Sequence, residues 1–182
     1  MTSAARLVLS DARFAVEAHG EQLHGEAFRI SWFAVVGLLR AVGHVLSTLD
    51  RNTSPEMRRS IDRHWSELQG SKPDPAIFWG FIEFERNRYL KNYEHGILRR
   101  RVFLSSDNKT PIALDLANSQ AGMMVQVVSA GSLPNDVAHR SVVSTIADGP
   151  FAGRSERQVA VQALDWWSEY LDKVDYEANA DA

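Results

Sequence analysis

The chain has 182 residues, of which 45% are apolar and 24% charged, and its formal net charge is -3. A chain of this size can bury one globular core, and its weak negative charge excludes an overall attraction to nucleic acid or anionic lipid. The absence of cysteine excludes disulfides, thiolate metal sites and a cysteine nucleophile. We expect no cofactor and no metal, because the glycines form no phosphate-binding motif and the histidines form no ligand cluster with carboxylates.

The N-terminal stretch "MTSAARLVLSDARF" has charges among its apolar residues and lacks a signal-peptide core, which predicts a cytoplasmic protein. The most apolar run, residues 30–46, is shorter than the roughly 20 residues that cross a membrane, and it contains Arg40 and His44. We therefore expect a buried helix of a soluble protein and no membrane contact.

Four helices are predicted in the first part of the chain, at residues 5–19, 26–49, 55–70 and 75–96. Ser54 and Pro55 form a helix-start signal, since serine caps the first turn and proline fits the first helical position. Asp74 and Pro75 repeat this signal, and Gly96 is the expected stop. The second helix carries an apolar stripe that predicts its buried face: Phe28, Trp32, Val35, Leu39, Val42 and Leu46.

Short β-branched or alternating runs separated by turn residues follow and predict three or four strands within residues 99–148. A last amphipathic helix is expected at residues 155–174, followed by a frayed acidic tail. The predicted class is α+β, with a helical bundle (5–96), a small β-meander and a C-terminal helix in one domain, 1–182. Two domains with a break near residue 97 are the alternative.

The stretch "FIEFERNRYLKNYEHG" (81–96) places Glu85 and Arg86 within an otherwise apolar helix face. Stability alone is a weak reason for burying an ion pair, so the two residues either fix the register of neighbouring helices or line a pocket. Arg40 and His44 share one face of the second helix. If the two helices are antiparallel neighbours, all four side chains would form a polar cluster suited to acid–base chemistry or anion binding.

A local basic patch with interleaved aromatic residues spans residues 86–101 of this acidic protein. Its basic members are Arg86, Arg88, Lys91, Arg99, Arg100 and Arg101, and Asn87 is a further candidate binding residue between the first two. Such a patch is expected where a polyanion docks, with RNA or an acidic protein as the partner. The alternative is a set of solvated arginines that complement the dipole of a helix C-terminus.

Arg88 and His95 are separated by six residues near the end of the predicted fourth helix and lie on nearly the same face of it. This pattern on a helical bundle resembles that of HEPN domains, and the resemblance covers residues 5–96. It implies a metal-independent ribonuclease in which His95 transfers protons and Arg88 stabilises the phosphorane, often across a dimer. The segment "ERNRYLKNYE" is also similar to a pattern of uncharacterised bacterial proteins, which implies no activity.

Two functions of different classes follow from the sequence. The first is a non-catalytic binding protein whose basic patch contacts an acidic partner, and it asks nothing unusual of any residue. The second is a HEPN-like ribonuclease that uses Arg88 and His95, with Arg86 and Asn87 nearby. A homodimer is compatible with both, because Ala34, Gly37 and Ala41 form a small-residue arc that allows close helix approach, within the chain or between two copies.

Overall fold

The computed structural model describes residues 1–20, 22–105, 111–116, 125–127 and 137–180. It describes the side chains of these residues except from position 100 to position 142, both included. The chain divides into two compact units. The first comprises Met1–His95, Gly149–Phe151 and Arg157–Ala182, and the second comprises Gly96–Asp148 and Ala152–Glu156. The boundary at Gly96 coincides with the alternative break expected near residue 97, and the single-domain expectation stays a prediction.

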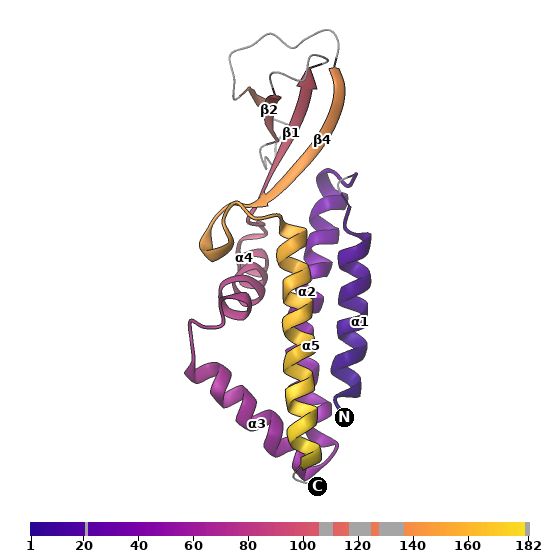
Figure 1. Ribbon diagram of the computed structural model, residues 1–182, viewed down its shortest axis with the longest axis vertical. Coiled ribbons are helices and arrows are strands. Elements are labelled where there is room, and N and C mark those ends of the chain that lie inside the picture. Colours follow the sequence, from indigo (N-terminus) through magenta and orange to yellow (C-terminus); the bar gives the residue numbers. More distant parts are fainter. Residues whose placement is uncertain (21, 106–110, 117–124, 128–136, 181–182) are drawn as a thin grey trace. The chain divides into compact units, whose positions relative to one another are not determined.

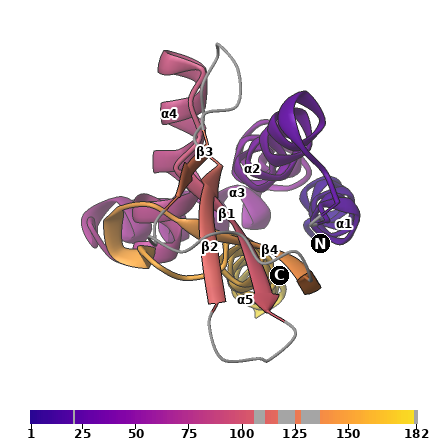
Figure 2. The same ribbon diagram turned by 90° about the horizontal axis from the view of Figure 1, so that it is seen from above.

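The fold class is α+β, as predicted, and the first unit is helical. Its described elements are α1 (Ser3–Ala18), α2 (Gly25–Thr48), the short η1 (Asp50–Asn52), α3 (Pro55–Gly70), η2 (Ile77–Glu83), α4 (Phe84–Asn92), η3 (Gly149–Phe151) and α5 (Glu156–Ala180) from its second residue onward. The helices α1, α2 and α5 run alongside one another, as the two views of the ribbon show (Figures 1 and 2).

The core of this unit consists of the predicted apolar stripes. All six stripe residues of α2 are buried, and Trp32, Leu39, Phe78 and Trp167 are at most 1% exposed. Complete burial of a side chain of this size stabilises the fold by roughly 1.5–3 kcal/mol. Apolar periodicity therefore placed the core correctly. α3 also begins as predicted, because the Ser54 hydroxyl accepts a hydrogen bond from the backbone N–H of Met57 at 3.1 Å.

Two carboxylates from distant segments bind the start of α1. Asp50 accepts hydrogen bonds from the backbone N–H groups of Ala4 (3.0 Å) and Ala5 (2.8 Å). Asp175 accepts them from the backbone N–H (2.7 Å) and the hydroxyl (2.9 Å) of Thr2. The prediction of a frayed tail after residue 174 is therefore wrong, because α5 continues to Ala180 and Asp175 is buried in this contact.

The prediction of one continuous α-helix over residues 75–96 is wrong. Its first part, η2, is a π-helix, in which the hydrogen bonds span five residues instead of four. Its second part, α4, ends at Asn92, because Tyr93 adopts a left-handed backbone with φ 54° and ψ 36°. The expectation that Glu85 faces inward is confirmed, since Glu85 is 3% exposed.

The small-residue arc of α2 does not bring another helix close within the described structure. A Cβ atom added at Gly37 would meet no heavy atom within 4 Å, and Ala34 is exposed. The prediction that Gly37 lets another helix of the same chain approach closely is therefore wrong, while the homodimer stays a prediction.

The second unit contains an antiparallel sheet with strand order β3-β2-β1-β4. Its described strands are β1 (Ile97–Ser105), β2 (Pro111–Leu116), β3 (Val125–Val127) and β4 (Val137–Ile146). Each contains part of a run predicted to be a strand. Arg99 on β1 lies opposite Ser144 on β4, and its Nε donates to the serine hydroxyl at 3.2 Å.

One described segment, Gly25–Asn52, is long and apolar enough to cross a membrane by length and composition. It is longer than the apolar run considered from the sequence, because helical structure extends past both ends of that run. The core helix of a soluble protein meets the same two criteria, and α2 supplies seven buried apolar residues to the described core. The cytoplasmic location and the lack of membrane contact remain predictions.

Candidate functional site

A groove with a volume of about 570 Å³ lies along η2 and α4 in the first unit. Residues at every fourth position share one side of this region, as on the surface of a helix. The groove is lined by Lys72, Trp79, Glu83, Phe84, Asn87, Arg88, Lys91 and Asn92. Three predicted binding or catalytic residues, Asn87, Arg88 and Lys91, therefore meet in one recess.

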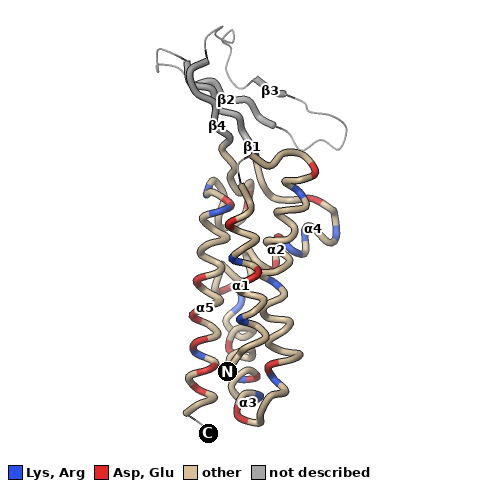
Figure 3. Tube along the Cα trace, turned by 90° about the vertical axis from the view of Figure 1, so that its right-hand side faces the viewer, with Lys and Arg blue, Asp and Glu red and all other residues tan. Residues whose placement is uncertain are grey.

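The groove is positively charged. Lys72, Arg88 and Lys91 outnumber Glu83, its single carboxylate, and two asparagine amides add neutral hydrogen-bonding groups. Figure 3 shows several Lys and Arg positions along α4, with acidic positions among them. A recess with concave walls strengthens the attraction of such charges for an anion.

Arg88 is held in place by two neighbours on its own helix. Its Nη1 donates to Oε1 of Glu85 at 3.4 Å, and its guanidinium carbon lies 4.7 Å from the centre of the Phe84 ring. The Glu85 side chain is 3% exposed and the Arg88 side chain 17% exposed. The buried carboxylate thus braces an arginine that faces the groove, so the brace and the pocket are parts of one arrangement.

Trp79 and Lys72 form the other end of the groove and were missed in the sequence. The ammonium of Lys72 lies 4.7 Å from the centre of the Trp79 ring, and the indole N–H of Trp79 donates to the carbonyl oxygen of Leu68 at 3.3 Å. The spacing of Trp79, Glu83, Asn87 and Lys91 could have revealed Trp79. No local signal identifies Lys72, which lies in the turn before η2.

The predicted cluster of Arg40, His44, Glu85 and Arg86 forms only in part, because Arg40 and Arg86 interact electrostatically whereas Glu85 interacts with Arg88. Arg40 lies 6.0 Å from the ring centre of Phe78, and burial lowers its pKa. The charge of Glu83 has a smaller raising effect on this pKa, and the charge of Arg86 lowers it further.

The other three residues differ in exposure and in the hydrogen bonds that they make. His44 is exposed, whereas Glu85 interacts with Arg88. Arg86 donates to the side-chain oxygen of Asn87 at 2.8 Å. The four side chains do not all converge, because a shared helix face does not determine which neighbouring group each long side chain reaches.

Arg88 and His95 do not share a helix face, because α4 ends three residues before the histidine. His95 is 8% exposed and packs edge-on against Phe28 of α2, with ring centres 5.4 Å apart. It is not among the residues that line the groove. The catalytic role of the pair stays a prediction.

The remaining residues of the basic patch belong to the second unit. The side chain of Arg99 is buried and bonded to Ser144 within the sheet. The side chains of Arg100 and Arg101 lie outside the described residues. Only the part of the patch on α4 therefore has a described site.

Comparisons of the chain with protein-family models, with curated proteins and with solved structures found no match. Within the described ranges, no group of three His, Asp or Glu side chains is placed to hold a metal ion.

Proposed function

We propose that this chain is a non-catalytic binding protein that holds an acidic segment of a partner protein in the groove of η2 and α4. The observation that carries the proposal is the convergence of Lys72, Arg88 and Lys91 in one recess with aromatic walls. Opposite charge at such a surface accelerates association and selects the partner.

The charge of the molecule favours an acidic peptide over a nucleic acid. Nucleic-acid binding draws on many phosphate contacts, and each one needs a cation. The groove supplies three cations beside Glu83, one of which, Arg88, is paired with Glu85, on a chain with a net charge of -3. The cations of the groove are enough to bind a few carboxylates. A long phosphate backbone would extend beyond the groove and be repelled by the negative charge of the rest of the chain.

The walls of the groove suit a peptide as well. Trp79 and Phe84 offer ring surface to the aliphatic part of a bound chain, and tryptophan and arginine are common at the centres of protein interfaces. The amides of Asn87 and Asn92 can donate to backbone carbonyls and accept from backbone N–H groups. A segment of acidic residues alternating with apolar ones would use both kinds of contact.

Titration of fluorescent peptides tests this proposal. An eight-residue peptide of alternating Glu and Leu is expected to bind, and its Gln–Leu and Lys–Leu counterparts are expected to bind at least tenfold more weakly. The anisotropy of the labelled peptide gives the affinity, and binding should weaken with added salt because the groove is exposed.

Two charge reversals provide a matched comparison. Lys91→Glu reverses a charge inside the groove, and Lys173→Glu reverses an exposed charge on α5 with the same change in net charge. The first should weaken binding of the Glu–Leu peptide about tenfold or more, and the second should leave it nearly unchanged. Equal affinities of the two variants for the Glu–Leu peptide would refute the assignment of the site. If the wild type bound oligouridylate more tightly than the Glu–Leu peptide, RNA would be favoured as the partner.

Metal-independent ribonuclease activity is the second proposal, and it rests only on the resemblance of residues 5–96 to HEPN domains. Incubation of purified protein with a mixed RNA substrate tests it beside His95→Ala and Arg88→Ala. Cleavage that both substitutions abolish would support the enzyme. Because His95 is buried against Phe28, the His95→Ala variant must first be shown to fold. Inactivity of the dimeric wild type would exclude the activity.

A further inference from the structure

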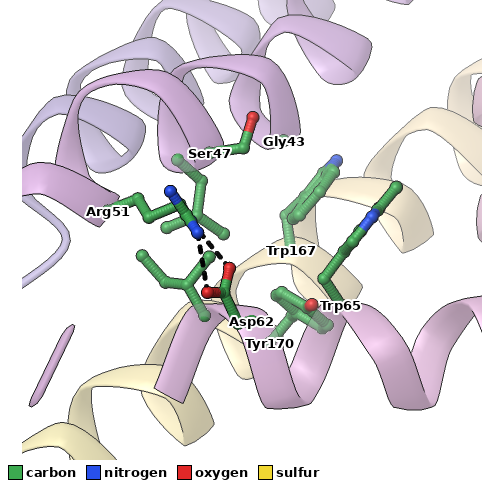
Figure 4. A pocket seen from close by; sticks show the side chains of 9 residues that line it. Gly43, Ser47, Arg51, Asp62, Trp65, Trp167 and Tyr170 are labelled. Carbon is green, nitrogen blue, oxygen red and sulfur yellow. Dashed lines mark hydrogen bonds and ion pairs between the residues drawn. The ribbon is translucent and has the colours of Figure 1, made fainter. Parts of the chain in front are cut away.

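A second pocket in the first unit lies between α2, α3 and α5, and it does not share any residue with the groove (Figure 4). Its volume is about 240 Å³. Trp65, Trp167 and Tyr170 supply aromatic lining, and Leu46 and Ile61 supply aliphatic lining. A small apolar cavity with a few polar groups is the usual form of a ligand site.

The aromatic part of the pocket is held in place by other rings. Trp167 is 1% exposed and packs edge-on against Phe78 at 5.8 Å and against Tyr170 at 5.5 Å between ring centres. Trp65 packs edge-on against the same Phe78 at 6.0 Å. This interlocked packing keeps the rings from collapsing into the space, so the pocket is formed before any ligand arrives.

Gly43 of α2 makes room beside the buried indole. A Cβ atom at this position would lie 2.8 Å from Cη2 of Trp167, which is closer than such atoms approach. The backbone of α2 can therefore come close to the ring, and Ser47, one turn later, lines the pocket with an exposed side chain. The pocket is thus reachable from solvent.

An ion pair supplies the polar edge opposite the rings, as Figure 4 shows. Nε and Nη2 of Arg51 donate to the two carboxylate oxygens of Asp62 at 2.7 and 2.8 Å. The two side chains are 36% and 50% exposed, so both can be approached by a ligand. Arg51 has further N–H donors and Asp62 further lone pairs.

The lining of the pocket carries no net charge, because the charges of Arg51 and Asp62 cancel. A cationic ligand would be attracted by the carboxylate and repelled by the guanidinium, and the reverse holds for an anion. Burial raises the pKa of Tyr170, with a smaller effect from Glu67, so the phenol is neutral at physiological pH. The charge balance therefore favours a neutral ligand.

We infer that this pocket binds a small, neutral, planar aromatic molecule whose edge carries both a hydrogen-bond acceptor and a donor, as a ring carboxamide does. The ring packs against the aromatic side chains, its acceptor receives a hydrogen bond from Arg51 and its donor bonds to Asp62. The volume limits the ligand to one or two rings. This inference does not depend on the acidic-partner proposal.

Four small probes of similar size separate the determinants of binding. Benzamide has the ring and the neutral edge, benzoate and benzylammonium keep the ring with either charge, and cyclohexanecarboxamide keeps the edge without an aromatic ring. Nuclear magnetic resonance follows the indole N–H signals of the ¹⁵N-labelled full chain. We expect benzamide to shift the signals of Trp65 and Trp167 with a dissociation constant on the order of 1 mM, while Trp79 in the groove stays unchanged.

Substitutions test the site itself. Ser47→Leu should fill the pocket and weaken benzamide binding at least fivefold, whereas Ser10→Leu, at an exposed position of α1, should have no effect. Asp62→Asn removes the carboxylate and leaves Arg51, so the preference should change from benzamide to benzoate. This variant alters an exposed side chain and should fold.

The inference is overturned if benzoate or benzylammonium binds the wild type more tightly than benzamide, or if cyclohexanecarboxamide binds equally well. It is also overturned if none of the four probes shifts the two indole signals at about 10 mM, ten times the expected dissociation constant. Unchanged benzamide binding by a folded Ser47→Leu variant would place the ligand elsewhere.

Discussion

Replacement of Asp50 tests how the N-terminus of α1 is stabilised. Asp50 is 1% exposed and its two oxygens accept the N–H groups of Ala4 and Ala5 in the first turn of α1. The residue in the usual capping position, Thr2, makes no side-chain cap, because its hydroxyl donates to Asp175. A distant carboxylate therefore performs the role that a local cap residue normally has.

The magnitude follows from the two hydrogen bonds. A hydrogen bond to a charged group contributes about 1.5–3 kcal/mol, so at the lower end of this range the loss of two in Asp50→Ala should lower the free energy of unfolding by about 3 kcal/mol. Asp50→Asn keeps one acceptor oxygen, so it should lower the free energy of unfolding by about half as much as Asp50→Ala. A loss of 3 kcal/mol corresponds to roughly 6–12 °C in Tm for a chain of this length.

Urea unfolding followed by far-ultraviolet circular dichroism measures the loss. Asp11→Ala is the matched control, because Asp11 is an exposed residue of α1. The Asp50→Ala midpoint should fall by roughly 1.5 M urea if the slope is about 2 kcal/mol/M. If Asp50→Ala and Asp11→Ala unfold at the same urea concentration, the capping role of Asp50 is wrong.

Two further predictions concern the glycines of α2 and the ion pair of the pocket. Gly37→Ala should raise the free energy of unfolding by roughly 0.5–1 kcal/mol, because alanine favours the helix and its Cβ meets no atom within 4 Å. Gly43→Ala should instead lower it by roughly 0–2 kcal/mol, since overpacking against the indole of Trp167 outweighs that gain; greater stability of Gly43→Ala than of Gly37→Ala in thermal unfolding would contradict this reasoning. The hydrogen bonds from Arg51 lower the pKa of Asp62, so the folded state binds its proton less tightly than the unfolded state. The stabilisation is therefore fully present above the unfolded pKa and is lost as the pH falls through the lower folded pKa. The stability of Asp62→Asn should accordingly change less than that of the wild type in acid titrations, and identical pH profiles would refute the effect.

Much of the fold could be predicted because its signals are local. The stripe from Phe28 to Leu46 predicted a buried helix face, and burial follows from the side chains that recur along one side of a helix. Ser54 capped α3 as predicted. The alternating runs after Gly96 predicted the strands of an antiparallel sheet.

The candidate site was predicted only in part. Asn87, Arg88 and Lys91 were recognised by charge and spacing, and they do line one groove. The π-helical segment and the left-handed Tyr93 were not predicted, because both depend on backbone hydrogen bonds that side-chain periodicity does not report. The left-handed turn ended the helix early and separated His95 from the face that carries Arg88.

The sequence by itself determined, outside residues 75–96, which segments are helices and strands and which helix faces are apolar, because these properties depend on residues near one another in the chain. Only the tertiary structure decided how the buried polar groups are satisfied and where space is left between helices. Asp50 and Asp175 reach the start of α1 from distant segments, and Gly43 approaches Trp167 across the bundle. A buried carboxylate must find hydrogen-bond donors, and a pocket must have walls, wherever packing brings distant residues together.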